Sequence, residues 1–154
     1  MSLVNSPDWL RFIVDREVND TDDARCYLQA GFFKCYNENG FGYDLVKTLD
    51  RTPIGMCGFL KKAVLENADF GFALHPHWFG LGLGLESATA VLDYGIRTYS
   101  FTALDAVTAP DNVRSKRLLD RLGFIRISAI GNIENTEFYR WRSESCNGIK
   151  TKYS

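Results

Sequence analysis

Residues 78–86 read WFGLGLGLE, in which three glycines alternate with leucines. The apolar run 69–74 before them predicts a strand. Apolar residues after them recur three or four positions apart, as in a helix packed on a sheet: Leu85, Ala88, Leu92 and Ile96. The glycines therefore stand between a strand and a helix N-terminus, where free backbone N–H groups and the helix dipole favour an anion.

Three kinds of phosphate-binding loop compete for this stretch. A P-loop requires Lys followed by Ser or Thr after its last glycine, but Leu85 and Glu86 stand there. A dinucleotide fingerprint requires a third glycine where the chain has Ser87. The third kind is a pyrophosphate cradle of the acetyl-coenzyme A type, in which glycines let the backbone approach the phosphates. A sharp strand-to-helix turn without a ligand is the alternative at this point.

The other segments predict a single α/β domain with a mixed sheet. Thr21 reads as the cap of the first helix, Pro53 as the residue that sets a hairpin turn, and Gly95 as the fraying end of the helix after the glycines. Residues 110–112 open the last helix and Gly123 ends it. The expected order is helix 21–35, strands 43–49, 54–60 and 69–74, helix 85–95, strand 103–108, helix 110–122, and strands 124–130 and 136–141. Strands 69–74 and 103–108 flank one crossover helix and should run parallel.

Composition restricts the function classes. The chain has 154 residues, and its 18 basic and 19 acidic residues give a net charge of −1, so bulk binding of nucleic acid is not expected. The four cysteines show no CxxC spacing and no signal peptide precedes them, which favours reduced thiols and a cytoplasmic protein. The uncharged run 70–85 contains Pro76, two histidines and four glycines, so it is not read as a membrane span.

Two separated motifs carry a family resemblance. PHWFGLGLGLESA at 76–88 resembles the P-x-Y-W-G-K-G-Y-A-T-E-A signature of the RimJ/RimL-like branch of the GNAT N-acetyltransferases, and DNVRSKRLLDRLGF at 111–124 resembles the N-x-x-S-x-x-L-L-x-x-L-G-F helix of that branch. PIGMCGF at 53–59 and DFGFALHP at 69–76 are similar to its central hairpin. The resemblance implies one GNAT domain over residues 1–145, followed by a polar tail at 146–154. It also implies an acetyl-CoA-dependent N-acetyltransferase that needs no metal, with acetyl-CoA between strands 69–74 and 103–108.

The resemblance also implies roles for particular residues. The backbone N–H groups of Leu81, Gly82, Leu83, Gly84, Leu85 and Glu86 would take the pyrophosphate, and Phe72, Ala73 and Leu74 would pair with the pantetheine amides. Asn112 would bond the cofactor through its side chain. Ser115 would protonate the departing thiolate, unless it is merely a small residue in the first helical turn. Arg117, in a stripe with Arg114 and Arg121, either attracts the 3′-phosphate of CoA or belongs to a solvated helix face.

Acetyl transfer requires a neutral amine, yet an α-amino group has a pKa of about 8 and a lysine one of about 10.4, so an acceptor for the proton is needed. Two carboxylates are candidates. Glu134 lies about where the RimJ/RimL-like branch has its acidic base, although it also reads as a surface-loop acid. Asp69 stands at the start of the strand that should carry the cofactor.

The chain departs from the family in three ways. Leu119 occupies the place where many members carry a tyrosine that serves as general acid, so that role cannot pass to it. Leu81 and Leu83 make the loop unusually apolar. The first strand of the family is missing, and an open sheet edge invites pairing into a homodimer. The acceptor is either a protein N-terminus or a small-molecule amine, and the alternative function is a catalytically silent CoA-binding or sensor domain.

Overall fold

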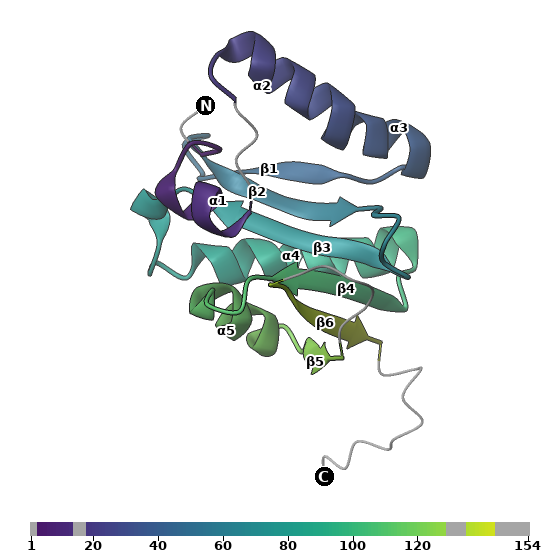
Figure 1. Ribbon diagram of the computed structural model, residues 1–154. Helices are drawn as coiled ribbons and strands as arrows, with labels where there is room; N and C mark the ends of the chain where they lie inside the picture. The colour runs from purple at the N-terminus through teal and green to yellow at the C-terminus, as the bar shows by residue number, and fades with distance from the viewer. Residues whose placement is uncertain (1–2, 14–17, 129–134, 144–154) are drawn as a thin grey trace.

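The computed structural model describes residues 3–13, 18–128 and 135–143. Figure 1 shows one sheet with helices on both sides. The strands are β1 (Tyr43–Lys47), β2 (Pro53–Leu60), β3 (Ala68–Leu74), β4 (Ala103–Thr108), β5 (Ile125–Ile127) and β6 (Glu137–Arg142). Their order in the sheet is β1-β2-β3-β4-β6-β5. Of the described residues, none before Tyr43 lies in a strand.

Helices account for the rest of the regular structure. They are α1 (Pro7–Phe12), α2 (Thr21–Leu28), the π-helical turn η1 (Gln29–Phe33), α3 (Lys34–Asn39), the 3₁₀ turn η2 (Pro76–Trp78), α4 (Leu83–Tyr99) and α5 (Val113–Arg121). Helix α1 lies in front of β2 and β3 in Figure 1, and α4 lies behind the sheet. None of the helices in these described ranges is long and apolar enough to cross a membrane.

The sheet is mixed, as predicted. Four neighbouring pairs are antiparallel, and β3 with β4 is the parallel pair. That parallel pairing extends over only two register positions, Ala68 with Leu104 and Asp69 with Asp105. Beyond Asp69 the two strands part, which is the geometry expected at the cofactor site.

The main core lies between the sheet and helices α4 and α5. Phe59 and Phe70 from the sheet pack with Ala88 of α4 and Leu119 of α5, and all four side chains are buried. The ring of Phe70 also stacks on Phe124, with centroids 5.5 Å apart. This packing fixes α4 and α5 on the same face and thereby places both helix N-termini at the end of the sheet where β3 and β4 part.

Several local predictions were wrong for identifiable reasons. Asp20, not Thr21, caps α2, because its carboxylate accepts hydrogen bonds from the backbone N–H groups of Asp22 and Asp23. The first helical segment continues through η1 and α3 to Asn39, where Gly40 ends it with φ of 76°.

Three further corrections concern the hairpin, α4 and β5. Pro53 is the first residue of β2 rather than part of the turn. Gly95 is not a fraying end but is buried inside α4. Glycine is needed there because a Cβ would overlap the ring of Phe59. Strand β5 is shorter than the predicted 124–130, and residues 129 and 130 lie outside the described part of the chain.

Candidate active site

The glycine loop between β3 and α4 adopts a backbone that requires glycine at two positions. Gly80 and Gly82 have φ values of 79° and 80°, in the left-handed region. A Cβ at either position would meet nothing within 4 Å, so conformation rather than space demands glycine there. Gly84 differs, because it lies in α4 and a Cβ there would make ordinary contact with Leu74 at 3.4 Å.

The loop presents consecutive free backbone donors. The N–H groups of residues 81–84 have no hydrogen-bond partner within the described part of the chain. The N–H groups of Leu85 and Glu86, which were expected to join them, both donate to the carbonyl of Gly82 at 3.1 Å. The expected donor range of 81–86 therefore shortens in this structure to 81–84, at the positive end of a seventeen-residue helix.

The expected pantetheine-binding segment lies beside this loop. Phe72, Ala73 and Leu74 pair with β2 along one edge of β3, and no register pair with β4 is formed along the other edge. Their backbone groups on that second edge therefore face the gap between the diverging strands. A ligand with amide groups, such as pantetheine, can pair with such an edge as a strand would.

Two expected site residues lie at the start of α5. The side-chain oxygen of Asn112 caps the helix by accepting a hydrogen bond of 3.1 Å from the N–H of Ser115, which leaves the Nδ2 group for a ligand. Ser115 is half-buried and lies three and four residues before Leu118 and Leu119, on the inward face of α5. Leu119 is 1% exposed and belongs to the core.

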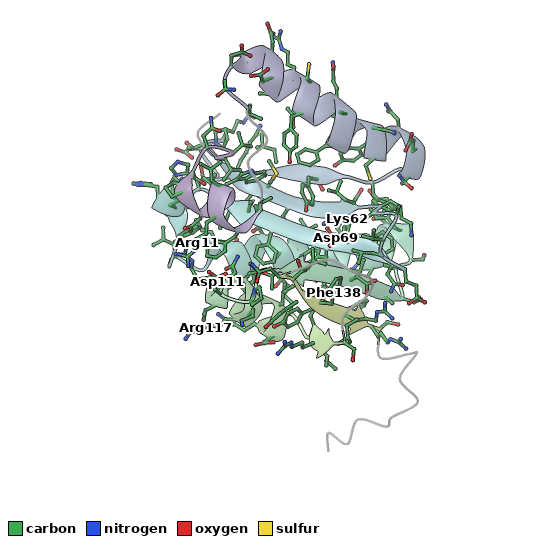
Figure 2. All side chains as sticks on the ribbon, in the orientation of Figure 1. Arg11, Lys62, Asp69, Asp111, Arg117 and Phe138 are labelled. Carbon is green, nitrogen blue, oxygen red and sulfur yellow. The ribbon has the colours of Figure 1, made fainter. Side chains whose placement is uncertain are left out.

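The arginine stripe of α5 is divided by its contacts. Arg114 forms an ion pair with Asp8 of α1, and its guanidinium lies 4.3 Å from the ring centroid of Phe79. Arg117, the residue expected to bind the 3′-phosphate, is exposed (Figure 2). The structure thus brings Arg114 against the chain that leads into the glycine loop.

Asp69 occupies the last paired position before β3 and β4 part. Its side chain is 3% exposed, and Oδ2 lies 2.6 Å from Nζ of Lys62 (Figure 2). Its other oxygen, Oδ1, is buried and has no hydrogen-bond partner among the described residues. Burial is the main cause that raises the pKa of Asp69, although Lys62 opposes the shift. Asp69 is therefore a buried carboxyl group with a raised pKa at the position where the two strands part.

Tyr43 of β1 shares the face of the sheet that carries Asp69. Its hydroxyl fills the space above Gly71, where a Cβ would overlap it. Burial raises the pKa of Tyr43, and the nearby charge of Asp69 raises it further. Lys62 and Tyr43 were not predicted as neighbours of Asp69, because their approach depends on strand register that no local motif encodes.

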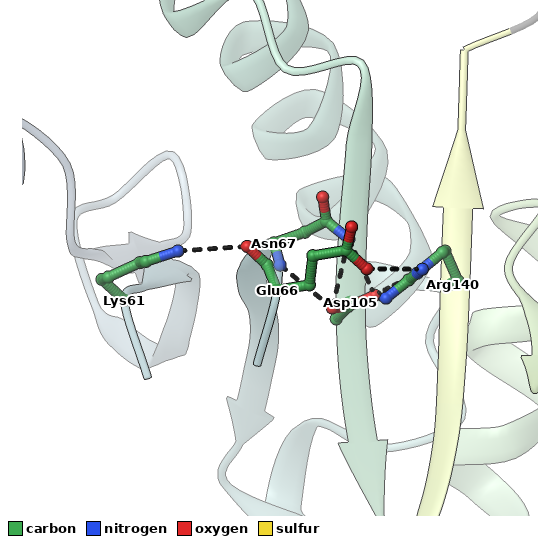
Figure 3. A network of polar contacts seen from close by, with 5 residues as sticks. All are labelled: Lys61, Glu66, Asn67, Asp105 and Arg140. Carbon is green, nitrogen blue, oxygen red and sulfur yellow. Dashed lines mark hydrogen bonds and ion pairs between the residues drawn. The ribbon is translucent and has the colours of Figure 1, made fainter. Parts of the chain in front are cut away.

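Asp105 lies opposite Asp69 in the register but belongs to a closed network (Figure 3). Its carboxylate accepts hydrogen bonds from Arg140, at 2.7 and 3.2 Å, and from the backbone and side chain of Asn67. Glu66 pairs with the same arginine at 3.0 Å. Burial alone would raise the pKa of Asp105, but these bonds outweigh it and lower the pKa.

The other candidates contribute less to this site. Glu134 lies outside the described residues. Two recesses, the larger of about 770 Å³, lie over β5 and β6 and not at the glycine loop. Within the described ranges no group of three or more His, Cys, Asp or Glu side chains is arranged to hold a metal ion.

Comparison with known proteins decides the family. The sequence model for the "Acetyltransferase (GNAT) domain" matches residues 1–125. The chain belongs to the GNAT acetyltransferase family. It is 29% identical over 112 residues to the [ribosomal protein uS5]-alanine N-acetyltransferase of Escherichia coli, covering 67% of this chain and 58% of that protein.

Other GNAT relatives and structures agree with the fold. The chain is 30% identical over 95 residues to an uncharacterized N-acetyltransferase, p20, of Bacillus licheniformis, covering 60% of this chain and 52% of that one. It spans a little more than half the length of the curated relatives that it matches. A GNAT acetyltransferase structure from Bacillus anthracis superposes with a TM-score of 0.68 at 20% identity, over 92% of this chain and 85% of that one. A mutant spermidine N-acetyltransferase from Vibrio cholerae gives 0.63 at 16% identity, over 80% and 74%.

Proposed function

We propose that this GNAT domain binds acetyl-CoA and transfers the acetyl group directly to a primary amine. The observation that carries the proposal is the row of free backbone N–H groups at 81–84, at the point where β3 and β4 part. An amide nest at a helix N-terminus fits a diphosphate without a basic side chain, which suits a loop with Leu81 and Leu83 at its centre.

Bound acetyl-CoA supplies a thioester, whose carbon forms a bond to the amine nitrogen as the bond to sulfur breaks. Asp69 is the proposed acceptor of the amine proton, because its buried Oδ1 has no donor in the part of the chain that the structure describes and its raised pKa makes it a stronger base than an exposed aspartate. The Ser115 hydroxyl is proposed to donate a proton to the departing thiolate and to regain one from solvent. Asn112 is proposed to bond the cofactor through Nδ2, and Arg117 to attract its 3′-phosphate.

The acceptor is a protein N-terminus or a small amine. One relative named above is a [ribosomal protein uS5]-alanine N-acetyltransferase, and one structural neighbour is a spermidine N-acetyltransferase, so a protein amine and a polyamine are both candidate acceptor classes. We also propose a cytoplasmic location. We further propose that two copies pair through the open edge of β1, and light scattering would test this pairing by measuring the molar mass in solution.

The decisive experiment measures binding and turnover separately. Isothermal titration with acetyl-CoA should show a single site per chain, and mass spectrometry should show acetylated product from a panel of alanine-terminated peptides and polyamines. Binding without turnover on any amine would instead favour the silent CoA-binding or sensor domain. Absence of binding would contradict both functions.

The loop itself can be tested with a matched pair of glycine variants. Gly82→Ala forces a side chain into the left-handed region, at a cost of about 1–2 kcal/mol, and should weaken acetyl-CoA binding about tenfold. Gly40→Ala imposes the same left-handed strain at a φ of 76° at the end of α3, away from the loop, and should leave binding nearly unchanged. Equal affinities for the two variants would show that the nest conformation is not what binds the ligand.

A further inference from the structure

Helix α1 is joined to the start of α5 by two reciprocal ion pairs. Arg11 Nη2 lies 2.7 Å from Asp111 Oδ2, and Arg114 pairs with Asp8 (Figure 2 labels the first pair). On each segment the acid and the base are three residues apart. These four residues, the α1–α5 ion-pair cluster, connect two segments that are about a hundred positions apart in the sequence.

Arg114 extends this cluster to the glycine loop. Its guanidinium lies 4.3 Å from the centre of the Phe79 ring, within the range of a cation–π contact. Phe79 immediately precedes Gly80, and its own N–H donates to the carbonyl of Pro76 at 3.1 Å. Arg114 of α5 therefore contacts both Asp8 of α1 and Phe79, the last residue before the loop.

The loop needs such an external constraint. Gly80 and Gly82 give the free chain more backbone freedom than other residues would, and that freedom must be lost when the amides converge on an anion. Leu81 between them is 64% exposed and contributes little packing. Phe79 and α4 border the loop at its two ends, so contacts made by either of them can orient it.

The position of Arg114 is unfavourable for α5 itself. It is the second residue of the helix, where the positive end of the helix dipole disfavours a cation. Asp8 offsets that charge from a neighbouring helix. A side chain that gains nothing from its own helix, and is held over Phe79 by a partner from α1, is placed to act on the loop.

We propose that Arg114 is a positioning residue for the diphosphate nest. Held by Asp8, it fixes Phe79 and thereby keeps the N–H groups of 81–84 oriented for the ligand, so α1 is coupled to cofactor affinity. The inference rests on the proposed function for its ligand, but the state of the loop is a property of the free protein.

Backbone amide NMR relaxation in the ligand-free protein tests the inference independently of CoA binding. Arg114→Ala should lower the order parameters of the 79–84 amides, because the loop loses a constraint on Phe79, and Arg121→Ala, a substitution in the same stripe, should not. Arg114→Lys, which preserves the charge for Asp8, should restore part of the order. Unchanged order parameters in Arg114→Ala would overturn the proposal even if the protein binds acetyl-CoA.

Affinity measurements then separate positioning from direct phosphate contact. Arg114→Ala should weaken CoA and dephospho-CoA equally, by about fivefold, as expected for loss of one exposed cation–π contact and its ion pair. At saturating acetyl-CoA, kcat and the KM for the amine should stay unchanged. A loss confined to CoA would mean that Arg114 contacts the 3′-phosphate and would overturn the positioning role. If the wild-type chain binds neither compound, the proposed function fails while the relaxation result still stands.

Discussion

Asp69 and Asp105 are register partners on adjacent strands and both are buried. They differ in their hydrogen-bond partners and in the direction in which their pKa is shifted. Asp105 accepts bonds from Arg140 and Asn67, and its pKa is lowered. Asp69 has Lys62 on one oxygen and no hydrogen-bond partner for the other among the described residues, and its pKa is raised. Both lie at the last position where β3 and β4 pair.

The difference suits the two carboxylates to different roles, one in stabilising the fold and one in accepting a proton. A buried carboxylate whose oxygens are fully bonded stabilises the fold and is a poor proton acceptor. A buried carboxylate with an unpartnered oxygen costs stability, and such costs are commonly found where function requires them. Asp105 therefore holds the paired ends of the strands together, and Asp69, at the last paired position before the strands part, has one oxygen with no donor among the described residues.

The largest effect on this comparison should come from removal of the partner of Asp105. Arg140→Ala leaves a carboxylate that is 1% exposed without a cation, and should lower the free energy of unfolding by about 3–5 kcal/mol in urea titrations. Arg142→Ala removes an exposed arginine from the same strand and should change it by less than about 0.5 kcal/mol. Similar losses of unfolding free energy for both variants would contradict the proposal that the bonds of Asp105 hold the strands together.

Asp69→Asn should separate activity from stability. The amide cannot accept the amine proton, so kcat should fall about a hundredfold or more, as for other general bases. The unfolding free energy should change far less than in Arg140→Ala, because Lys62 is 38% exposed and can turn to water. If kcat survives while stability falls, the roles of the two aspartates are the reverse of those proposed.

The two carboxylates should also respond oppositely to pH. The lowered pKa of Asp105 adds stability that is present above the unfolded pKa of about 3.9 and is lost as the pH falls through the folded pKa. The raised pKa of Asp69 adds stability that is present below about 3.9 and is lost as the pH rises through the folded pKa. The stability of Asp69→Asn relative to the wild type should therefore increase with pH above that value, as denaturant titrations at several pH values can measure. If the stability difference between Asp69→Asn and the wild type did not change with pH, the pKa of Asp69 would not be raised.

The smallest effect should follow from loss of Lys62. This lysine lowers the pKa of Asp69 against the effect of burial, so Lys62→Met should move the acidic limb of the pH–rate profile to higher pH and leave the plateau rate nearly unchanged. Lys61→Met is the control, because Lys61 donates to the carbonyl of Glu66 instead. An unshifted limb in Lys62→Met would mean that another group is the base.

The glycine loop shows how much of the site local sequence can predict. Alternating glycines between an apolar strand and an amphipathic helix predicted a nest at a helix N-terminus, and Gly80 and Gly82 adopt the left-handed backbone that only glycine readily takes. The extent of the nest was not predictable in the same way. Whether Leu85 and Glu86 keep free N–H groups depends on the first turn of α4, where both donate to Gly82.

Gly95 and Asp20 show where local reading fails. The helical pattern predicts Gly95 as a fraying end, but the structure requires glycine there because a Cβ would overlap the ring of Phe59 on β2. Asp20 and Thr21 are both good caps, and only the position of the first helical turn chooses between them.

Sequence alone determined the order of the elements from residue 21 onward, the parallel pair β3 and β4, and the glycine-dependent turn between β3 and α4, because periodicity and glycine conformation are local properties of the chain. Only the tertiary structure decided that Asp69 keeps an unpartnered oxygen while Asp105 does not, and that Arg114 reaches Phe79 and Asp8. Those outcomes depend on strand register and helix packing between segments far apart in the chain. The same residue types in the same order would behave differently if either changed.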